Sequence, residues 1–232
     1  MLIFGLTKTT LLDYPGKVAA TIFTGGCNFR CPFCHNGGLV IDSKDMPIIS
    51  EEEIFSHLTK RRGILQGVCI SGGEPTLYND LPDFLQKVKS LGYEIKLDTN
   101  GSFPKRLAKL IDGGLVDYIA MDIKNCKDKY ARTAGCDDLE IKDISESIKL
   151  IKSSNIPFEF RTTIVKELHT LKDLLEIREW IGEVPWYLQS YKDSPSVIQE
   201  GLNGYKEAEL RNMLKEIKEK NGTNTVWLRG VE

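Results

Sequence analysis

The stretch GGCNFRCPFCHNGG, residues 25–38, packs three cysteines, one histidine and four glycines into fourteen positions. Its cysteines, Cys27, Cys31 and Cys34, are spaced four and three residues apart. Clustered thiols in a reducing compartment are typical of metal binding or redox chemistry. The glycines allow sharp turns and a close approach of backbone to a bound group. The stretch therefore predicts a metal centre with three protein thiols and one ligand still to be found.

Two kinds of centre suit these thiols, zinc and an iron–sulfur cluster. A structural zinc site needs four ligands, and His35 is the available fourth one. Joint tetrahedral coordination by the adjacent residues Cys34 and His35 is awkward, however, and the chain has only one such cysteine knuckle. A four-iron cluster with three cysteine ligands leaves one iron open for a substrate. The spacing favours the cluster and leaves zinc open.

The composition is that of a globular protein. The chain has 232 residues, of which 41% are hydrophobic and 28% charged, with a net charge of −2. Interspersed charges give no footprint for nucleic acid or an anionic membrane surface. The apolar runs are only strand-length, and the start, MLIFGLTKTTLLDYPGK, lacks the features of a signal peptide. We therefore expect a cytoplasmic protein with no nucleic-acid or membrane partner and no disulfide framework.

Short apolar strands alternate with amphipathic helices along the chain. The predicted strands are 17–23, 67–71, 93–100, 116–124, 157–165, 185–191 and 225–230. The predicted helices are 51–62, 81–92, 104–114, 143–154, 170–182 and 205–222. Strict alternation predicts an α/β fold with a parallel sheet and right-handed crossovers. Either an open doubly wound sheet or a barrel-like curl satisfies this pattern.

Two of these helices carry clear start signals. Ser50 and Glu53 form a capping-box pattern at the first helix, and Pro104 is a first-turn proline. No linker or repeat interrupts the alternation, so the sequence predicts a single domain over 1–232. Its core spans about 17–191, and a C-terminal helix and last strand lie within 205–230.

Polar residues follow several predicted strands, at the edge where parallel α/β sheets place their chemistry. SGGEPT (71–76) follows the second strand, and its Glu74 offers a carboxylate that could hold an ammonium group. DTNG (98–101) and AMDIK (120–124) end the next two strands. Taken singly, such residues are most often solvated loop residues or helix caps. Their convergence beside the cysteine loop indicates a ligand site, with Asp98, Thr99, Asp122 and Lys124 as further candidates.

These motifs together resemble a known family. CNFRCPFC fits the C-x3-C-x2-C signature of radical S-adenosylmethionine (SAM) enzymes, and SGGEP fits their glycine-rich motif. CHN at 34–36, LDTNG at 97–101 and MDIK at 121–124 resemble the glycyl-radical activating enzymes. The opening, GLTKTTLLDYPGKVAATIFTGGCNFRCPFCHN, is similar to the anaerobic ribonucleoside-triphosphate reductase activating proteins in particular. The resemblance extends from about residue 5 to the strand at 157–165.

The resemblance implies a fold, a reaction and two cofactors. It implies a partial (β/α)6 barrel of parallel strands, with a 4Fe-4S cluster held by Cys27, Cys31 and Cys34. The open iron would chelate SAM, so that the cosubstrate supplies the missing ligand. Reductive cleavage of SAM in that family yields a radical that removes hydrogen from a glycine of a partner enzyme. The partner here would be anaerobic ribonucleotide reductase or another glycyl-radical enzyme, and the electron donor flavodoxin or ferredoxin.

The resemblance also assigns SAM-binding positions. Gly72, Gly73 and Glu74 match residues that bind the methionyl end of SAM, and Lys124 and Arg161 match further SAM-contacting residues. No catalytic residue is implied beyond the cluster and SAM.

A monovalent cation is the third group that the resemblance implies. Asp98, Thr99 and Asp122, with the carbonyl of Ala120, match the positions that hold such a cation beside the SAM carboxylate in pyruvate formate-lyase activase. That enzyme has a SAM-contacting histidine at the end of the sixth strand, where this chain departs from it and reads QSYK (189–192).

Three alternatives stay open. An activase of a pyruvate formate-lyase-like enzyme shares the same motifs. A radical SAM enzyme acting on a small molecule, such as a deazaguanine precursor, is compatible because the strand-end motifs report on SAM more than on the substrate. A zinc-binding adaptor without catalysis is the alternative outside enzymes. The sequence gives no role to Cys126, Cys136 or His35.

Overall fold

The computed structural model describes residues 1–41, 46–222 and 224–231. The chain divides into two compact units that interleave along the sequence. The first unit comprises Met1–Asn28, Gly38–Ala120 and Asp143–Pro157, and the second comprises Phe29–Gly37, Met121–Lys142 and Phe158–Glu232. The prediction of a single domain stays a prediction.

In the described part of the chain, eight strands follow one another in chain order in one sheet. They are β1 (Ile3–Thr10), β2 (Ala19–Thr24), β3 (Gly67–Gly72), β4 (Glu94–Thr99), β5 (Tyr118–Asp122), β6 (Phe158–Ile164), β7 (Trp186–Ser190) and β8 (Val226–Arg229). β1 pairs with β2 in the antiparallel sense. Parallel pairing joins β2 to β3, β3 to β4, β6 to β7 and β7 to β8. The predicted α/β class is confirmed.

All six predicted helices are present. The helices are α1 (Gly37–Ile41), α2 (Glu51–Lys60), α3 (Leu81–Ser90), α4 (Pro104–Asp112), α5 (Tyr130–Ala134), α6 (Ile141–Ser153), α7 (Leu171–Ile181) and α8 (Glu207–Asn221). Two short 3-10 turns, η2 (Pro75–Leu77) and η3 (Lys127–Lys129), were not predicted, and neither were α1 and α5. No described helix is long and apolar enough to cross a membrane.

Capping residues explain where the predicted helices begin. The Ser50 hydroxyl accepts a hydrogen bond from the backbone N–H of Glu53 at 3.1 Å, which starts α2 at the expected residue. α4 begins at Pro104, also as predicted. At α7, Thr170 and Asp173 cap each other reciprocally.

Among the strands, β1 (Ile3–Thr10) was not predicted from the sequence. Its sequence, IFGLTKTT, is buried only at Ile3 and Phe4, so it lacks the alternation that marks a half-buried strand. Its register against β2 shifts twice, between Ile3 and Gly5 and between Thr7 and Thr10. β1 therefore forms through antiparallel pairing with β2, a tertiary effect that local pattern does not encode.

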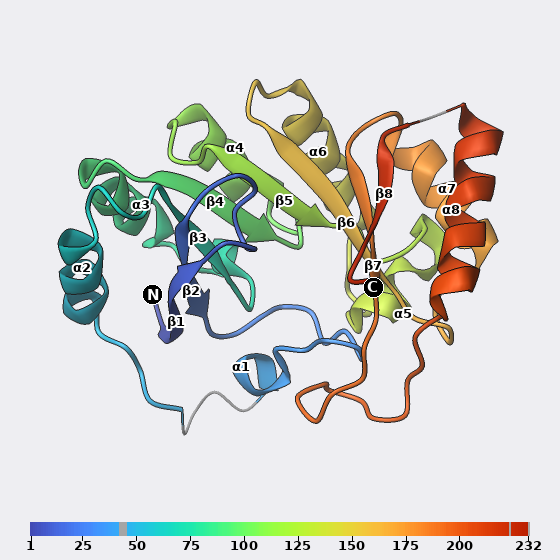
Figure 1. The fold of residues 1–232 in the computed structure, drawn as a ribbon, viewed down its shortest axis with the longest axis horizontal. Helices are drawn as coiled ribbons and strands as arrows, with labels where there is room; N and C mark the ends of the chain where they lie inside the picture. The colour runs from blue at the N-terminus through green and yellow to red at the C-terminus, as the bar shows by residue number, and fades with distance from the viewer. Residues whose placement is uncertain (42–45, 223, 232) are drawn as a thin grey trace. The chain divides into compact units, whose positions relative to one another are not determined.

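In the first unit, β2 to β4 form the buried centre. Their burial is nearly continuous, as expected of parallel strands that are covered on both faces. α3 lies next to β4 and buries Leu81, Phe84, Leu85 and Val88 (Figure 1). The loops that follow β2, β3 and β4 at their carboxyl ends carry the predicted site residues of this unit.

In the second unit, β6 to β8 run beside one another, and α8 lies next to both α7 and β8 (Figure 1). The centre of this unit contains Trp186, which is fully buried and donates its indole N–H to the Thr162 hydroxyl at 2.9 Å. Among the predicted site residues of this unit, Asp122 ends β5, Lys124 follows it and Arg161 lies within β6, whereas Cys31 and Cys34 lie in the segment Phe29–Gly37.

Candidate functional site

The glycine pair after β3 packs against the segment that leads into the cysteine loop. The backbone N–H of Gly73 donates to the Thr24 carbonyl at 2.8 Å, and that of Glu74 donates to the Gly26 carbonyl at 2.9 Å. A Cβ atom on Gly73 would lie 1.8 Å from the Gly26 oxygen, and Gly72 has a φ of +105°. Both positions require glycine because the two loops touch through their backbones.

The Glu74 carboxylate, only 1% exposed, is surrounded by hydrogen-bond donors. Its Oε1 accepts from the Thr76 hydroxyl, from the Thr76 N–H at 3.0 Å and from the Thr99 hydroxyl at 2.8 Å. Its Oε2 accepts from the Asn100 N–H at 2.7 Å. Burial raises the pKa of Glu74, whereas these hydrogen bonds act to lower it. Glu74 thus ties the loop after β3 to the end of β4, and its predicted ammonium contact stays a prediction.

Asn100 is a site residue that sequence analysis passes over. Its side-chain amide donates to Cys27 Sγ at 3.7 Å and to Asn28 Oδ1 at 2.9 Å. Its Oδ1 accepts from the Ser102 N–H at 2.9 Å. An N–H directed at a cysteine sulfur orients a metal ligand and stabilises a thiolate. The available signal was its position directly after Asp98 and Thr99.

Asp98 is paired with a lysine of its own strand. Lys96 and Asp98 lie two residues apart on β4 and so share one face of the sheet. The Lys96 ammonium forms an ion pair with Asp98 Oδ1, and the Ser71 hydroxyl donates to Oδ2 at 3.0 Å. Lys96 is 2% exposed. Sequence analysis passed over Lys96 because lysine is rarely buried unless it is paired.

In the second unit, three predicted site residues meet. Asp122 Oδ2 lies 3.0 Å from Lys124 Nζ, and Asp122 Oδ1 lies 2.8 Å from Arg161 Nε. Burial alone would raise the pKa of Asp122, but the charges of Arg161 and Lys124 hold it well below its usual range. Conversely, burial would lower the pKa of Lys124, but Asp122 and Cys31 raise it well above its usual range.

The second cysteine of the triplet is buried in the same unit. Cys31 is 6% exposed, and its Sγ lies 3.6 Å from the Ala134 carbonyl oxygen. The Cys34 N–H donates to the Cys31 carbonyl at 3.0 Å, which closes a tight turn between two predicted ligands. Burial raises the pKa of the Cys31 thiol to about 11, with Lys124 acting in the opposite direction. Metal binding requires the thiolate and would release this proton.

His35 is engaged with the C-terminal part of its unit. Its Nε2 lies 2.7 Å from the Lys192 carbonyl oxygen, and its ring packs on Tyr191 with centroids 5.5 Å apart. This contact occupies the nitrogen Nε2, which weighs against His35 as the fourth ligand of a zinc site. It also gives the QSYK segment (189–192) a contact with the cysteine loop.

Cys126 belongs to a separate cluster whose geometry is structural. Ligand atoms of Cys126, Asp173 and Glu176 lie within 4.8 Å of one another. Asp173, however, caps α7 through Thr170 and is ion-paired with Lys129 at 2.7 Å. Burial raises the pKa of the Cys126 thiol to about 11. The described contacts therefore account for the cluster without a metal ion.

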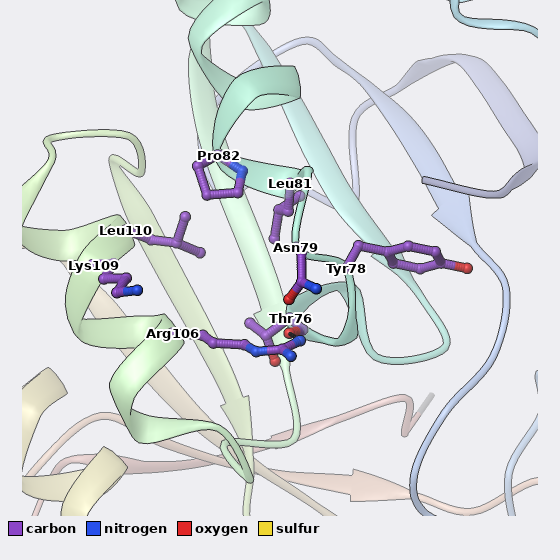
Figure 2. A pocket seen from close by; sticks show the side chains of 8 residues that line it. All are labelled: Thr76, Tyr78, Asn79, Leu81, Pro82, Arg106, Lys109 and Leu110. Atoms are coloured by element: carbon purple, nitrogen blue, oxygen red, sulfur yellow. Dashed lines mark hydrogen bonds between the residues drawn. The ribbon is translucent and has the colours of Figure 1, made fainter.

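A small pocket is lined by residues of η2, α3 and α4, among them Thr76, Leu81 and Arg106 (Figure 2). Its volume is about 140 Å³, below the roughly 300–1,000 Å³ of typical ligand sites. Arg106 points into it, and this guanidinium donates to the Thr76 carbonyl at 2.6 Å and to the Leu77 carbonyl at 2.5 Å (Figure 2). Arg106 therefore stabilises the backbone of η2, the turn that Glu74 caps.

Comparison with known proteins identifies the family. The model of the Radical SAM superfamily matches residues 21–181, which include the cysteine triplet and every predicted SAM-contacting residue. The chain belongs to the radical SAM superfamily. Membership implies a 4Fe-4S cluster and SAM as cofactors. The α/β fold and the radical SAM superfamily expected from the sequence are confirmed.

Two sequence relatives differ in how much of their length is matched. A Methanocaldococcus jannaschii protein named "Putative glycyl-radical enzyme activating enzyme" is 35% identical over 92% of this chain and 90% of its own length. A Thermococcus kodakarensis protein named "Probable GTP 3',8-cyclase" is 30% identical over 69% of this chain. The chain spans about half the length of that cyclase, 52%.

Solved structures of radical SAM enzymes share the fold. A radical SAM methyltransferase from Sphaerobacter thermophilus superposes with a TM-score of 0.74 at 12% identity, covering 95% of this chain and 68% of its own. TYW1 with a lysine-pyruvate adduct bound gives a TM-score of 0.63 at 15% identity, covering 88% and 74%. At these identities the likeness concerns the fold alone.

The residues of this radical SAM protein fit the cluster chemically. Thiolates are the usual ligands of iron–sulfur clusters, and the amide of Asn100 is directed at Cys27. The cationic Lys124 acts to favour the thiolate form of Cys31. Both features stabilise the negative charge that cluster ligation needs.

Proposed function

We propose that this protein is a glycyl-radical activase whose partner is anaerobic ribonucleoside-triphosphate reductase. The observation that carries the proposal is the relative with an activating-enzyme name, which is matched over nine-tenths of both chains. The motifs at 34–36, 97–101 and 121–124 support the same subtype. We further propose a low-potential electron donor such as flavodoxin or ferredoxin.

Three cysteines, Cys27, Cys31 and Cys34, would hold the cluster and leave one iron for SAM. When bound, the reduced cluster and SAM supply a 5′-deoxyadenosyl radical, which takes hydrogen from a glycine of the partner. The chain's own residues bind and orient these groups and keep water out.

The two groups of site residues would act on SAM in different ways. Gly72, Gly73 and Glu74 lie at the end of β3 and in the hydrogen-bonded turn after it, and their backbone would meet the methionyl end of SAM. Lys124 and Arg161, fixed by Asp122, present positive charge suited to a carboxylate. In this proposal the backbone at Gly72–Glu74 positions SAM, and the cations Lys124 and Arg161 attract its carboxylate.

Electron paramagnetic resonance tests the activase function. Reduced, cluster-loaded protein with SAM and the reductase of the same organism should yield the doublet of a glycyl radical. A reductase whose radical-site glycine is replaced by alanine should give no signal. SAM alone should be cleaved slowly and without a stable product radical. A doublet that persists with the alanine variant would contradict the proposal.

A small-molecule radical SAM enzyme is the second candidate. The observation that favours it is the 30% identity to the protein named as a GTP cyclase. Incubating the reduced protein with SAM and GTP, or with a deazaguanine precursor, tests this candidate directly. Rapid turnover of either compound, with no radical on any glycyl-radical partner, would replace the activase proposal and keep the radical chemistry.

A further inference from the structure

The monovalent cation expected from the resemblance does not fit the residues of this chain. That cation would take Asp98, Thr99 and Asp122 as ligands, together with the Ala120 carbonyl. Hard cations are bound by oxygen ligands, and a carboxylate that is already paired with an ammonium or guanidinium group attracts a further cation less strongly. Each of the two carboxylates already has a cationic partner within its own unit of the chain.

At Asp98 the partner is the ammonium group of Lys96. This lysine is 2% exposed, so its charge has no access to bulk water and depends on a counterion. Its Nζ also lies 3.8 Å from Cys69 Sγ of β3, opposite Lys96 in the parallel register. A metal ion on Asp98 would have to share its carboxylate with this fixed like charge.

At Asp122 the partners are Lys124 and Arg161, at 3.0 and 2.8 Å. The remaining predicted ligand, the Thr99 hydroxyl, donates to Glu74 Oε1 and accepts from the Gly101 N–H at 3.1 Å. The donor position of this hydroxyl and one of its two acceptor positions are therefore already occupied, which leaves one acceptor position.

We propose that this protein binds SAM without a monovalent cation, and that Lys96 supplies at Asp98 the positive charge of that cation. The inference rests on the proposed SAM site. Within the first unit Lys96 balances the charge of Asp98. Within the second unit Asp122 is paired with two bases, Lys124 and Arg161. In both units the positive charge beside the acid is covalently part of the chain.

Equilibrium binding of SAM to the cluster-loaded protein tests the proposal. The dissociation constant should be the same in potassium, sodium and choline chloride at equal ionic strength. A weaker affinity in choline chloride that potassium restores would overturn the proposal. Failure to bind SAM in any of the three salts would instead contradict the proposed function.

The variant Lys96→Met is expected to create a cation dependence. Its SAM affinity in choline chloride should fall by about tenfold or more, the scale of a lost interaction with a charged group, and potassium should restore it. The matched control is Lys17→Met, which removes the ion pair with Glu94 at the other end of β4. It should bind SAM equally in all three salts. Unchanged affinity of Lys96→Met in choline chloride would contradict the role of Lys96.

Melting temperatures give a readout that does not depend on SAM. Potassium should raise the melting temperature of Lys96→Met relative to choline and leave that of the unaltered protein unchanged. The double variant Lys96→Met/Asp98→Asn removes both charges of the buried pair and should show no effect of potassium. Selective stabilisation of the unaltered protein by potassium would overturn the proposal, whether or not SAM binds.

Discussion

Glu74 and Asp122 are two acids of the candidate site whose charges are balanced in different ways. Glu74 is 1% exposed and accepts hydrogen bonds from four neutral donors. The side chain of Asp122 is 30% exposed and is paired with two cations. The pKa is raised at Glu74, where burial dominates, and lowered at Asp122, where the charges of Arg161 and Lys124 outweigh burial. The contrast indicates a geometric role for Glu74 and an electrostatic role for Asp122.

The largest expected effect is the loss of the cluster, which tests whether both units contribute cysteine ligands. Changing Cys27, Cys31 or Cys34 to alanine should abolish cluster binding. Cys27 belongs to the first unit, as Glu74 does, whereas Cys31 and Cys34 belong to the second unit, as Asp122 does. Three thiolates are the minimum that leaves one iron open. Iron and sulfide content after anaerobic reconstitution measures the effect. The control Cys69→Ala, buried in β3, should keep the cluster. The ligand assignment is wrong if Cys69→Ala loses iron and the triplet variants keep it.

The second largest effect is expected on stability, when the Glu74 carboxylate is removed from its neutral hydrogen-bond donors. Glu74→Ala leaves four donors without their acceptor, and each buried unsatisfied group costs about 1–3 kcal/mol. The free energy of unfolding should therefore fall by roughly 3 kcal/mol or more. Glu74→Gln keeps one carbonyl oxygen for the donors and should be less destabilising. Denaturant titration measures both. A loss below about 1 kcal/mol in Glu74→Ala would show that the loop does not depend on this carboxylate.

A smaller loss in the free energy of unfolding is expected when Asp122 is changed. Asp122→Asn leaves Lys124 and Arg161 without their shared counterion. The loss should be about 1–2 kcal/mol, below the 3–5 kcal/mol of a fully buried pair, because Asp122 is partly exposed to water. Adding Lys124→Met should recover part of that loss, as a double-mutant cycle measures. Full additivity of the two substitutions would contradict the assigned pairing.

The smallest expected effect is the pH dependence of stability that His169 causes. His169 is fully buried, its Nδ1 accepts from the Val165 N–H at 3.2 Å, and its Nε2 contacts the Lys124 carbonyl at 2.7 Å. Burial lowers its pKa in the folded protein, despite these two backbone hydrogen bonds. Its contribution to stability is therefore complete above the unfolded value of about 6.5 and is lost as the pH falls below it.

Denaturant titrations between about pH 7.5 and 5.5, where histidine titrates, measure this slope. In His169→Gln the slope should be reduced. An unchanged slope would mean that other groups cause the pH dependence.

The sequence predicts much of this fold because the signals are local. Pro104 and the Ser50–Glu53 cap mark helix starts, and the buried runs of β3 and β4 mark parallel strands. β1 escapes prediction because its pairing with β2 forms it, and its own pattern shows no alternation.

The site residues likewise divide into those that the sequence predicts and those that it does not. The cysteine triplet, the glycine pair and Asp122 stand in motifs with a chemical rationale. Lys96 stands outside these motifs and pairs with Asp98 two residues further along the same strand. Asn100 lies within DTNG (98–101), but its role arises from a tertiary contact with Cys27. A lysine inside an apolar strand becomes informative only when its partner is known.

Deuterium transfer from the glycine of the partner enzyme to 5′-deoxyadenosine tests the proposed activase function. Anaerobic ribonucleotide reductase carrying glycine deuterated at Cα would be mixed with the reduced, cluster-loaded protein and SAM. Mass spectrometry would then measure the label in the 5′-deoxyadenosine formed. We expect one deuterium per 5′-deoxyadenosine, in an amount that matches the glycyl radical formed. Unlabelled 5′-deoxyadenosine, formed while the reductase stays free of radical, would contradict the proposed activase function.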